Sequence, residues 1–243
     1  MCLLVVQKPN TKMSNKNISN AWDSNSDGSG YSFSKDGIII TKKYMDLKEF
    51  KFNFNSDWNS NKDKTFLIHF RYATHGLKNV DNVHPFNVNK NLVFAHNGII
   101  NCVDDDNKLS DTQMYNKQVL QKLDKSFLKS NAMKLLIEES IGNSKLAFLD
   151  NNGHYSIINE SSGHWNKHKS IWYSNDGYKK SKVFVSGGQW NGFNFNRKQD
   201  SFQLANNKWL RCDWCNCETD STYNFYTNEL CENCYDSQSK YMD

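Results

Sequence analysis

Four cysteines near the end of the chain impose the strongest constraint on its fold. Two residues separate Cys212 from Cys215, two separate Cys231 from Cys234, and fifteen lie between the pairs. So short a segment cannot bury enough core to fold alone, whereas two such pairs can converge on one tetrahedral Zn²⁺ that supplies the missing free energy. The spacing predicts a structural zinc module over residues 209–243, in preference to a disulfide pair or unrelated surface cysteines.

A fifth cysteine and the local charge bear on what this module does. Cys217 is an alternative ligand, ranked lower because it breaks the symmetric pairing. Every charged side chain from Cys212 to Asp236 is acidic. An acidic segment is poorly suited to the phosphate contacts that supply most nucleic-acid affinity, so nucleic acid is not an expected partner. The net charge of +4 indicates no other partner. We favour a structural or protein-docking role, with a solvated acidic face as the alternative.

The rest of the 243-residue chain is long enough for one larger domain. Strands, then two adjacent helices, then strands favour an α+β layered domain over residues 1–190, followed by a linker at 191–208. Residues 46–64 are polar and are expected to be irregular. The expected strands lie at 3–6, 37–43, 65–76, 92–100, 145–150, 154–160, 171–175 and 182–188, and the stretch 25–33 is expected to be a Gly-rich turn that enters a further strand. The expected helices lie at 14–22, 110–128 and 131–141.

Two of these expectations are specific. The strand at 65–76 alternates its side chains in the manner of a half-buried strand. Asn97-Gly98 is the strongest short signal for a hairpin turn.

The chain contains no sign of membrane insertion or secretion. No stretch approaches 18 apolar residues, and the N-terminus lacks the basic-then-apolar layout of a signal peptide. We therefore expect a cytoplasmic location and no membrane partner. In a reducing compartment the seven cysteines are expected to be ligands, nucleophiles or core residues rather than disulfides.

The N-terminal stretch MCLLVV places Cys2 directly after the initiator methionine. If Met1 is removed, Cys2 carries both a thiol, with a pKa of about 8.5, and an α-amino group, with a pKa of about 7.7–8.0. Such a residue holds a nucleophile and its own base. On position alone, a buried cysteine of the first strand is the simpler interpretation.

Further motifs favour the nucleophile. They are RYATHG (71–76), HPF (84–86), AHNG (95–98) and SDT (110–112). Together with Cys2, these motifs make the chain resemble the class II glutamine amidotransferases, which are N-terminal-nucleophile hydrolases, over roughly residues 2–190. Two others, NSDGSGY (25–31) and WYSN (172–175), resemble the short stand-alone members found in phages. The resemblance implies a four-layer αββα sandwich, here with a small C-terminal zinc ribbon.

The resemblance also implies a role for each matching residue. Cys2 would attack the side-chain amide of glutamine and form a γ-glutamyl thioester, while its amino group moves the proton. Asn97 and Gly98 would form the oxyanion hole. Arg71 would bind the α-carboxylate of glutamine and Asp111 its α-ammonium. Residues Thr74, His75 and Gly76 would shape the pocket. Singly, these residues also fit a solvated strand residue, an ordinary hairpin and an ordinary helix start.

The sequence departs from the family in three places near these residues. Tyr72 stands where many members have tryptophan, Leu3 stands where many have glycine, and Gln113 stands where an acidic residue is common. Since only glycine takes certain backbone conformations without strain, Leu3 puts the backbone around Cys2 in question.

Several alternatives remain open at this point. The same fold could act on another γ-glutamyl or peptide amide, or the chain could be a non-catalytic adaptor that uses its zinc ribbon. Four histidines could suggest a metal cluster, but their spacing matches no ligand motif: they are His69, His75, His84 and His96. Because ammonia made without a recipient is wasteful, we also expect an ammonia-accepting partner enzyme.

Overall fold

The structure is a computed structural model that describes residues 2–73, 77–101, 103 and 109–179, together with four short strands nearer the C-terminus. The chain divides into two compact units, residues 1–184 and 185–243. The predicted linker at 191–208 and the predicted strand at 182–188 lie outside the described residues.

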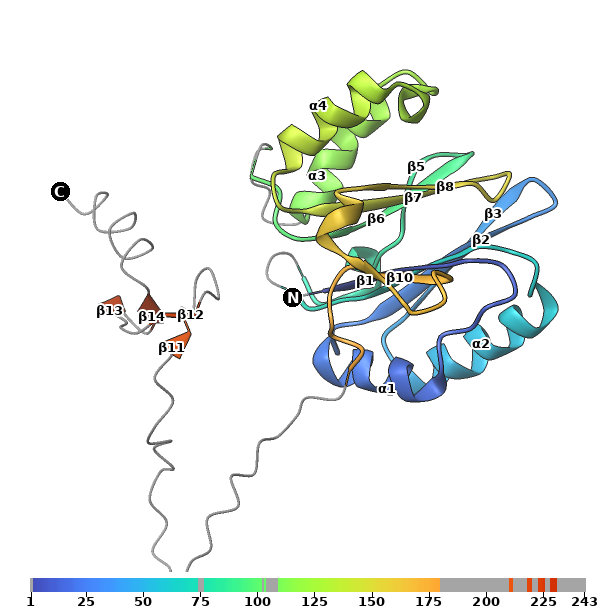
Figure 1. Cartoon of the computed structure of the whole chain (residues 1–243), viewed down its shortest axis with the longest axis horizontal. Helices are drawn as coiled ribbons and strands as arrows, with labels where there is room; N and C mark the ends of the chain where they lie inside the picture. Colours follow the sequence, from blue (N-terminus) through green and yellow to red (C-terminus); the bar gives the residue numbers. More distant parts are fainter. Residues whose placement is uncertain are drawn as a thin grey trace, which may run out of the picture. The chain divides into compact units, whose positions relative to one another are not determined.

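The N-terminal unit is built on two antiparallel sheets (Figure 1). The first is six-stranded, in the order β3-β2-β4-β1-β10-β9. Its strands are β1 (Leu3–Gln7), β2 (Ser29–Lys35), β3 (Ile38–Tyr44), β4 (Phe66–Phe70), β9 (His164–Trp165) and β10 (Ile171–Tyr173). The second is four-stranded, in the order β5-β6-β7-β8. Its strands are β5 (Phe86–Asn89), β6 (Leu92–Asn97), β7 (Lys145–Asp150) and β8 (Tyr155–Ile158).

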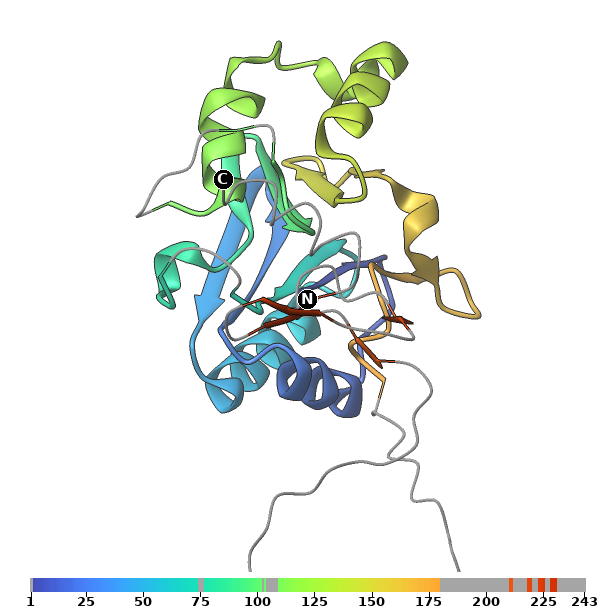
Figure 2. The same ribbon diagram turned by 90° about the vertical axis from the view of Figure 1, so that its left-hand side faces the viewer.

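Two pairs of helices cover the outer faces of the sheets (Figure 2). Helices α1 (Asn15–Ser24) and α2 (Leu47–Ser60) pack on the first sheet, and helices α3 (Asp111–Gln118) and α4 (Asn131–Ile141) pack on the second. Single 3₁₀ turns lie at η1 (Val80–Asn82), η2 (Leu120–Lys122), η3 (Phe127–Lys129) and η4 (Glu160–Ser162).

Three apolar clusters give the order of the layers. One joins α1 and α2 to the first sheet, another joins α3 and α4 to the second, and a third lies between the sheets. Strand β1 contributes to two of them, because Leu3 faces the helices and Leu4 faces the other sheet. The expected helix–sheet–sheet–helix layering is therefore present, and the central strands are buried on both faces.

Local signals in the sequence correctly indicated several element ends. Ser14 caps α1 by accepting from the Asn17 backbone N–H. Ser110 and Gln113 form the predicted capping box at the start of α3. Helix α4 ends at Gly142, whose φ of +54° a glycine adopts without steric cost.

The segment predicted to be irregular, residues 46–64, instead contains α2. Its cap is Asp46, which accepts from the Glu49 backbone N–H. The apolar residues Leu47, Phe50, Phe54 and Trp58 recur every three or four positions and pack on the first sheet. The asparagines and lysines between these apolar residues obscured the helical periodicity in the sequence.

Three further expectations were wrong in detail. Strand β4 is buried on both faces rather than half-buried, since α1 and α2 cover one face and the second sheet covers the other. Helix α3 ends at Gln118, and only 3₁₀ turns follow up to residue 129. Asn97-Gly98 is not a hairpin turn, because β6 pairs with β5 and with the distant β7, and the chain continues from Gly98 toward α3.

The C-terminal unit contains two antiparallel pairs of short strands. Strand β11 (Leu210–Arg211) pairs with β12 (Glu218–Thr219), and β13 (Tyr223–Phe225) pairs with β14 (Asn228–Leu230). The predicted ligands Cys212, Cys215, Cys231 and Cys234, and the alternative Cys217, lie outside the described residues. Within the described residues, no helix has the length and apolar character needed to span a bilayer.

Candidate active site

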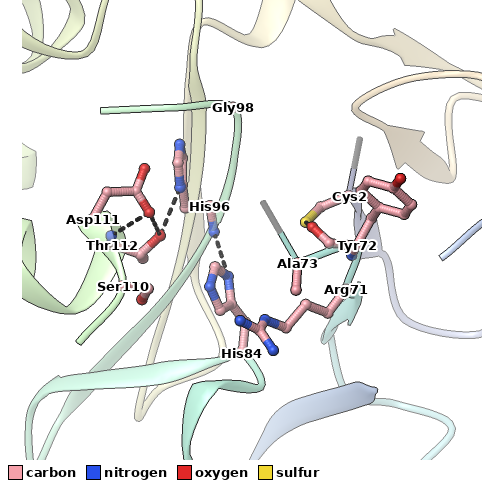
Figure 3. Close-up of a pocket in the computed structure, with 10 residues that line it drawn as sticks. All are labelled: Cys2, Arg71, Tyr72, Ala73, His84, His96, Gly98, Ser110, Asp111 and Thr112. Carbon is pink, nitrogen blue, oxygen red and sulfur yellow. Dashed lines mark hydrogen bonds between the residues drawn. The ribbon is translucent and has the colours of Figure 1, made fainter. Parts of the chain in front are cut away.

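Four of the predicted site residues line one pocket at the end of the two sheets (Figure 3). Cys2 precedes β1, Arg71 follows β4, Gly98 follows β6 and Asp111 begins α3. Tyr72 and Ala73 lie on the same side as Cys2, and Ser110 and Thr112 lie across the pocket. The cavity measures about 30 Å³.

Cys2 is half-buried, and its thiol lies against the backbone of Tyr72. The thiol donates to the Tyr72 carbonyl at 3.3 Å and accepts from the Tyr72 N–H at 3.3 Å. Its own carbonyl accepts from Asn175 Nδ2 at 2.7 Å. Burial raises the pKa of the Cys2 thiol, and the backbone hydrogen bond to Tyr72 opposes that rise. At neutral pH the thiol is therefore protonated, and attack by its sulfur requires a base.

Arg71 lies on the wall of the pocket and is only 4% exposed. Its Nη1 donates to the Leu77 carbonyl at 3.0 Å. Burial lowers the pKa of Arg71, while the charges of Cys2, Asp27 and Asp111 act in the opposite direction. An arginine keeps its proton at neutral pH in any such setting, so the pocket contains a fixed positive charge.

The NSDGSG segment holds the end of β4 in place. The Gly28 carbonyl accepts from the Arg71 N–H at 2.8 Å, and Asp27 Oδ2 accepts from the Ala73 N–H at 2.8 Å. Gly28 has a φ of +114°, and a side chain there would press on Val83. These contacts fix the backbone on both sides of Arg71.

Gly98 lies at the pocket and Asn97 lies behind it. Gly98 has a φ of +141°, and a Cβ at this position would lie 2.8 Å from the Ser144 Cα. Only glycine fits this close approach of two backbones. Asn97 is 1% exposed, and its Nδ2 donates to Ser174 Oγ at 2.6 Å. The Asn97 side chain is not part of the pocket lining.

Asp111 is held by hydrogen bonds at the start of α3. Its Oδ2 accepts from the Ile100 N–H at 2.8 Å, and its Oδ1 accepts from the Thr112 N–H at 2.7 Å and from Thr112 Oγ1 at 3.3 Å. A carboxylate has about four lone-pair positions, so these three bonds leave one position for a cation. The residue is thus both an ordinary part of a helix start and a fixed negative charge across the pocket from Cys2 (Figure 3).

Three buried histidines form the floor behind these residues. The rings of His69 and His84 stack at 4.1 Å between centroids, and those of His84 and His96 at 6.4 Å. His69 Nε2 donates to the His96 carbonyl at 3.0 Å, and His84 Nδ1 accepts from the His96 N–H at 3.1 Å. His96 Nδ1 bonds Thr112 Oγ1 at 2.8 Å.

Burial keeps these three imidazoles neutral, and the neighbouring histidines add to this effect at His69 and His84. Burial, then the charge of His96, lowers the pKa of His69 to about 3. Burial lowers the pKa of His96 to about 4, and burial followed by the charges of the other two histidines lowers the pKa of His84 far below its usual value. The histidines are not placed as a metal site: among the described residues no group of three or more potential ligands is suitably arranged.

Part of the predicted site cannot be placed, and part of the observed site was not predicted. Thr74, His75 and Gly76 lie outside the described residues. The WYSN motif supported the resemblance without any role for its members, yet Ser174 and Asn175 contact Asn97 and Cys2. Such contacts join residues that are far apart in the chain, and no local sequence pattern predicts them.

Comparisons with known proteins give limited information. No protein-family model matches the chain, and no curated protein matches it. Among solved structures, glutamine phosphoribosylpyrophosphate amidotransferase from B. subtilis, complexed with ADP and GMP, matches with a TM-score of 0.41 and 16% identity, over 71% of this chain and 41% of that one. A glutamine aminotransferase class-II domain protein from Silicibacter pomeroyi matches with a TM-score of 0.42 and 13% identity, over 71% of this chain and 87% of that one.

The first match thus spans less than half the length of the amidotransferase. At these identities and TM-scores the similarity assigns no function to the chain.

Proposed function

We propose that this chain is a class II glutamine amidotransferase-type hydrolase in which Cys2, freed by removal of Met1, attacks the side-chain amide of glutamine. The observation that carries the proposal is the convergence of Cys2, Arg71, Gly98 and Asp111 on one pocket from four separate segments. Each residue has an ordinary explanation by itself. Their convergence around a half-buried thiol is expected of an active site, whereas the stability of the fold does not require it.

The proposed reaction begins with the sulfur of Cys2. It bonds to the amide carbon and gives a tetrahedral intermediate, which collapses to a γ-glutamyl thioester and releases ammonia. Water then cleaves the thioester to glutamate and regenerates the thiol. Because burial raises the pKa of the thiol, a base must take its proton, and the freed α-amino group of Cys2, with a pKa of about 7.7–8.0, fits that role. The same group would return the proton to the leaving nitrogen.

The oxyanion of the intermediate needs donors fixed in advance. We assign this role to the backbone N–H of Gly98 and the side-chain amide of Asn97. Gly98 lines the pocket in a conformation enforced by Ser144, and Asn97 is the residue before it. Removing one such donor typically lowers kcat by about 10²–10³.

Arg71 and Asp111 would select a free amino acid as substrate. A guanidinium binds both oxygens of a carboxylate, which suits the α-carboxylate of glutamine, and Asp111 offers a fixed negative charge for the α-ammonium. The two charges lie on opposite sides of the pocket from one another (Figure 3). An amidase for blocked γ-glutamyl or peptide amides would have no use for this pair.

The experiment that tests the proposal is the intact mass of the purified protein before and after reaction with 6-diazo-5-oxo-norleucine, an electrophilic mimic of glutamine. We expect Met1 to be absent and one adduct to form on Cys2. The variant Cys2→Ser should form no adduct, and Cys102→Ser, which changes another cysteine, should react as the wild type does. Retained Met1 with no adduct would refute the proposal. Turnover of glutamine whose α-carboxylate is amidated would favour the wider amidase.

We also propose that the cysteines of the C-terminal unit bind one structural zinc ion and that the released ammonia passes to a partner enzyme. The spacing of the cysteines supports zinc, and Cys212 and Cys215 fall between the paired strands β11 and β12. The purified protein should contain one zinc per chain, and the Cys212→Ser and Cys231→Ser variants should lose it. Stoichiometric zinc retained in both variants would contradict this assignment. Recovery of the native protein with no associated enzyme at near-physiological concentration would argue against a partner.

A further inference from the structure

Ser174 lies at a junction between the two sheets. Its Oγ accepts from the Leu4 N–H at 2.9 Å, and its backbone N–H donates to the Leu4 carbonyl at 2.9 Å. The same Oγ lies 2.6 Å from Asn97 Nδ2. All three residues are at most 1% exposed. One hydroxyl therefore connects the nucleophile strand β1, in the first sheet, to the end of β6, in the second.

Some polar groups of Asn97 and Ser174 lack a hydrogen-bond partner in this orientation of the Asn97 amide. Among the described residues, Asn97 Oδ1 is buried without a hydrogen-bond partner, and the Ser174 hydroxyl already accepts from the Leu4 N–H. If the Asn97 NH₂ also donates to that hydroxyl, the serine proton has no acceptor in this arrangement. Two groups are then left unpaired in a buried site, which native structures rarely tolerate without a reason.

Exchanging the oxygen and nitrogen of the Asn97 amide satisfies the serine hydroxyl. The two orientations have the same shape, and the hydrogen-bond network decides between them. In the exchanged orientation Ser174 Oγ accepts from Leu4 and donates to Asn97 Oδ1, so the hydroxyl is fully used. The Asn97 NH₂ then occupies the corner that has no partner among the described residues, and its two N–H donors are the groups left unpaired. A donor held without an acceptor matches what an oxyanion hole requires, because its partner arrives only with the reaction.

We infer that Ser174 is a positioning residue that fixes the side-chain amide of Asn97 with its NH₂ directed away from the serine, as a donor for the oxyanion. The inference rests on the proposed function and specifies how one part of that site is set. The next residue works in the same direction, because Asn175 Nδ2 holds the Cys2 carbonyl at 2.7 Å. The turn after β10 thereby aligns the nucleophile and the oxyanion donor from one point.

The test is a double-mutant cycle on glutamine hydrolysis. Asn97→Ala should lower kcat by about 10²–10³, and Ser174→Ala should lower it at least tenfold with KM changed less than threefold. In the Asn97→Ala background, Ser174→Ala should change kcat less than threefold, because its effect acts through Asn97. Ser174→Thr, which keeps the hydroxyl, should restore most of kcat. Ser32→Ala, which removes another buried hydroxyl that bonds Thr41 at 2.7 Å, is the matched control and should leave kcat unchanged.

A purely structural role would show as equal losses from Ser174→Ala in both backgrounds, and that result would overturn the inference. A second readout is independent of activity. In protein labelled with ¹⁵N-asparagine, the side-chain NH₂ signals of Asn97, assigned by their loss in Asn97→Ala, should move in Ser174→Ala and return in Ser174→Thr. Unmoved signals would refute the inference even if the enzyme is active. Moved signals in a protein that neither hydrolyses glutamine nor reacts with the electrophile would retain the positioning role and reject the proposed function.

Discussion

Mild acid should destabilise this protein steeply because three imidazoles are buried neutral behind the pocket. His69, His84 and His96 have pKa values lowered by burial, to about 3 for His69 and about 4 for His96. In the unfolded chain each has a pKa of about 6.5. Below that value the unfolded state takes up protons that the native state does not, so stability falls as pH falls. The loss begins near pH 6.5 and continues to the folded pKa values.

The magnitude follows from the number of protons. For each imidazole that is protonated only in the unfolded state, the free energy of unfolding falls by about 1.36 kcal/mol per unit decrease in pH. Three such imidazoles lower it by about 4 kcal/mol per unit. Allowing for incomplete titration near pH 6, the free energy of unfolding should fall by about 5 kcal/mol between pH 6 and pH 4.5. That is a large share of the roughly 5–15 kcal/mol that stabilises a typical domain.

Urea denaturation at half-unit pH steps measures this loss directly. His69→Gln keeps a donor for the His96 carbonyl but removes one titrating group, so the loss should shrink by about one third, to about 3.5 kcal/mol. His168→Gln, at an exposed position, is the control and should leave the pH dependence unchanged. A free energy that is flat between pH 6 and pH 4.5, or a slope insensitive to His69→Gln, would refute the reasoning.

Three further predictions concern the site and the fold. Gly98→Ala should abolish activity and lower the free energy of unfolding by more than about 2 kcal/mol, because its Cβ would press on Ser144 at a φ of +141°. Gly37→Ala, at a φ of +73° in open space, should lower it by only about 1 kcal/mol. Equal losses in urea denaturation would contradict the clash at Gly98. Arg71→Lys should raise KM for glutamine about tenfold or more, because an ammonium lacks the planar fork; an unchanged KM in steady-state kinetics would remove Arg71 from the substrate site. Asp46→Ala should cost about 1 kcal/mol by uncapping α2 and Asp46→Asn much less, and equal urea midpoints for the two variants would argue against the cap.

Local sequence signals correctly predicted several features of the fold. A serine before α1, a capping box before α3 and a glycine after α4 each marked a helix end correctly, because a cap depends on residues within a turn of it. The same local reasoning failed where tertiary packing decided the outcome. Helix α2 is defined by Phe50 and Phe54, which face the first sheet, and the polar residues elsewhere in the helix obscure this apolar face in the sequence.

The hairpin predicted at Asn97-Gly98 failed for a related reason. The dipeptide has the right turn chemistry, but β6 finds its partner in β7, beyond two helices, with Asn97 opposite Lys145. Gly98 is needed for a different purpose, the close approach of Ser144. A sequence motif states which conformations a segment tolerates and leaves its pairing partner open.

By itself, the sequence determined several apolar strands and several helix ends, because these depend on residue type and short-range order, and the resemblance of its motifs to a known family supplied the candidates Cys2, Arg71, Gly98 and Asp111. Only the tertiary structure decided that these four residues share a pocket, that His69, His84 and His96 are stacked and neutral behind it, and that Ser174 bridges Leu4 and Asn97. Those features arise where strand ends of the two sheets meet. They depend on strand register and layer packing across the whole domain, which no short stretch of residues encodes.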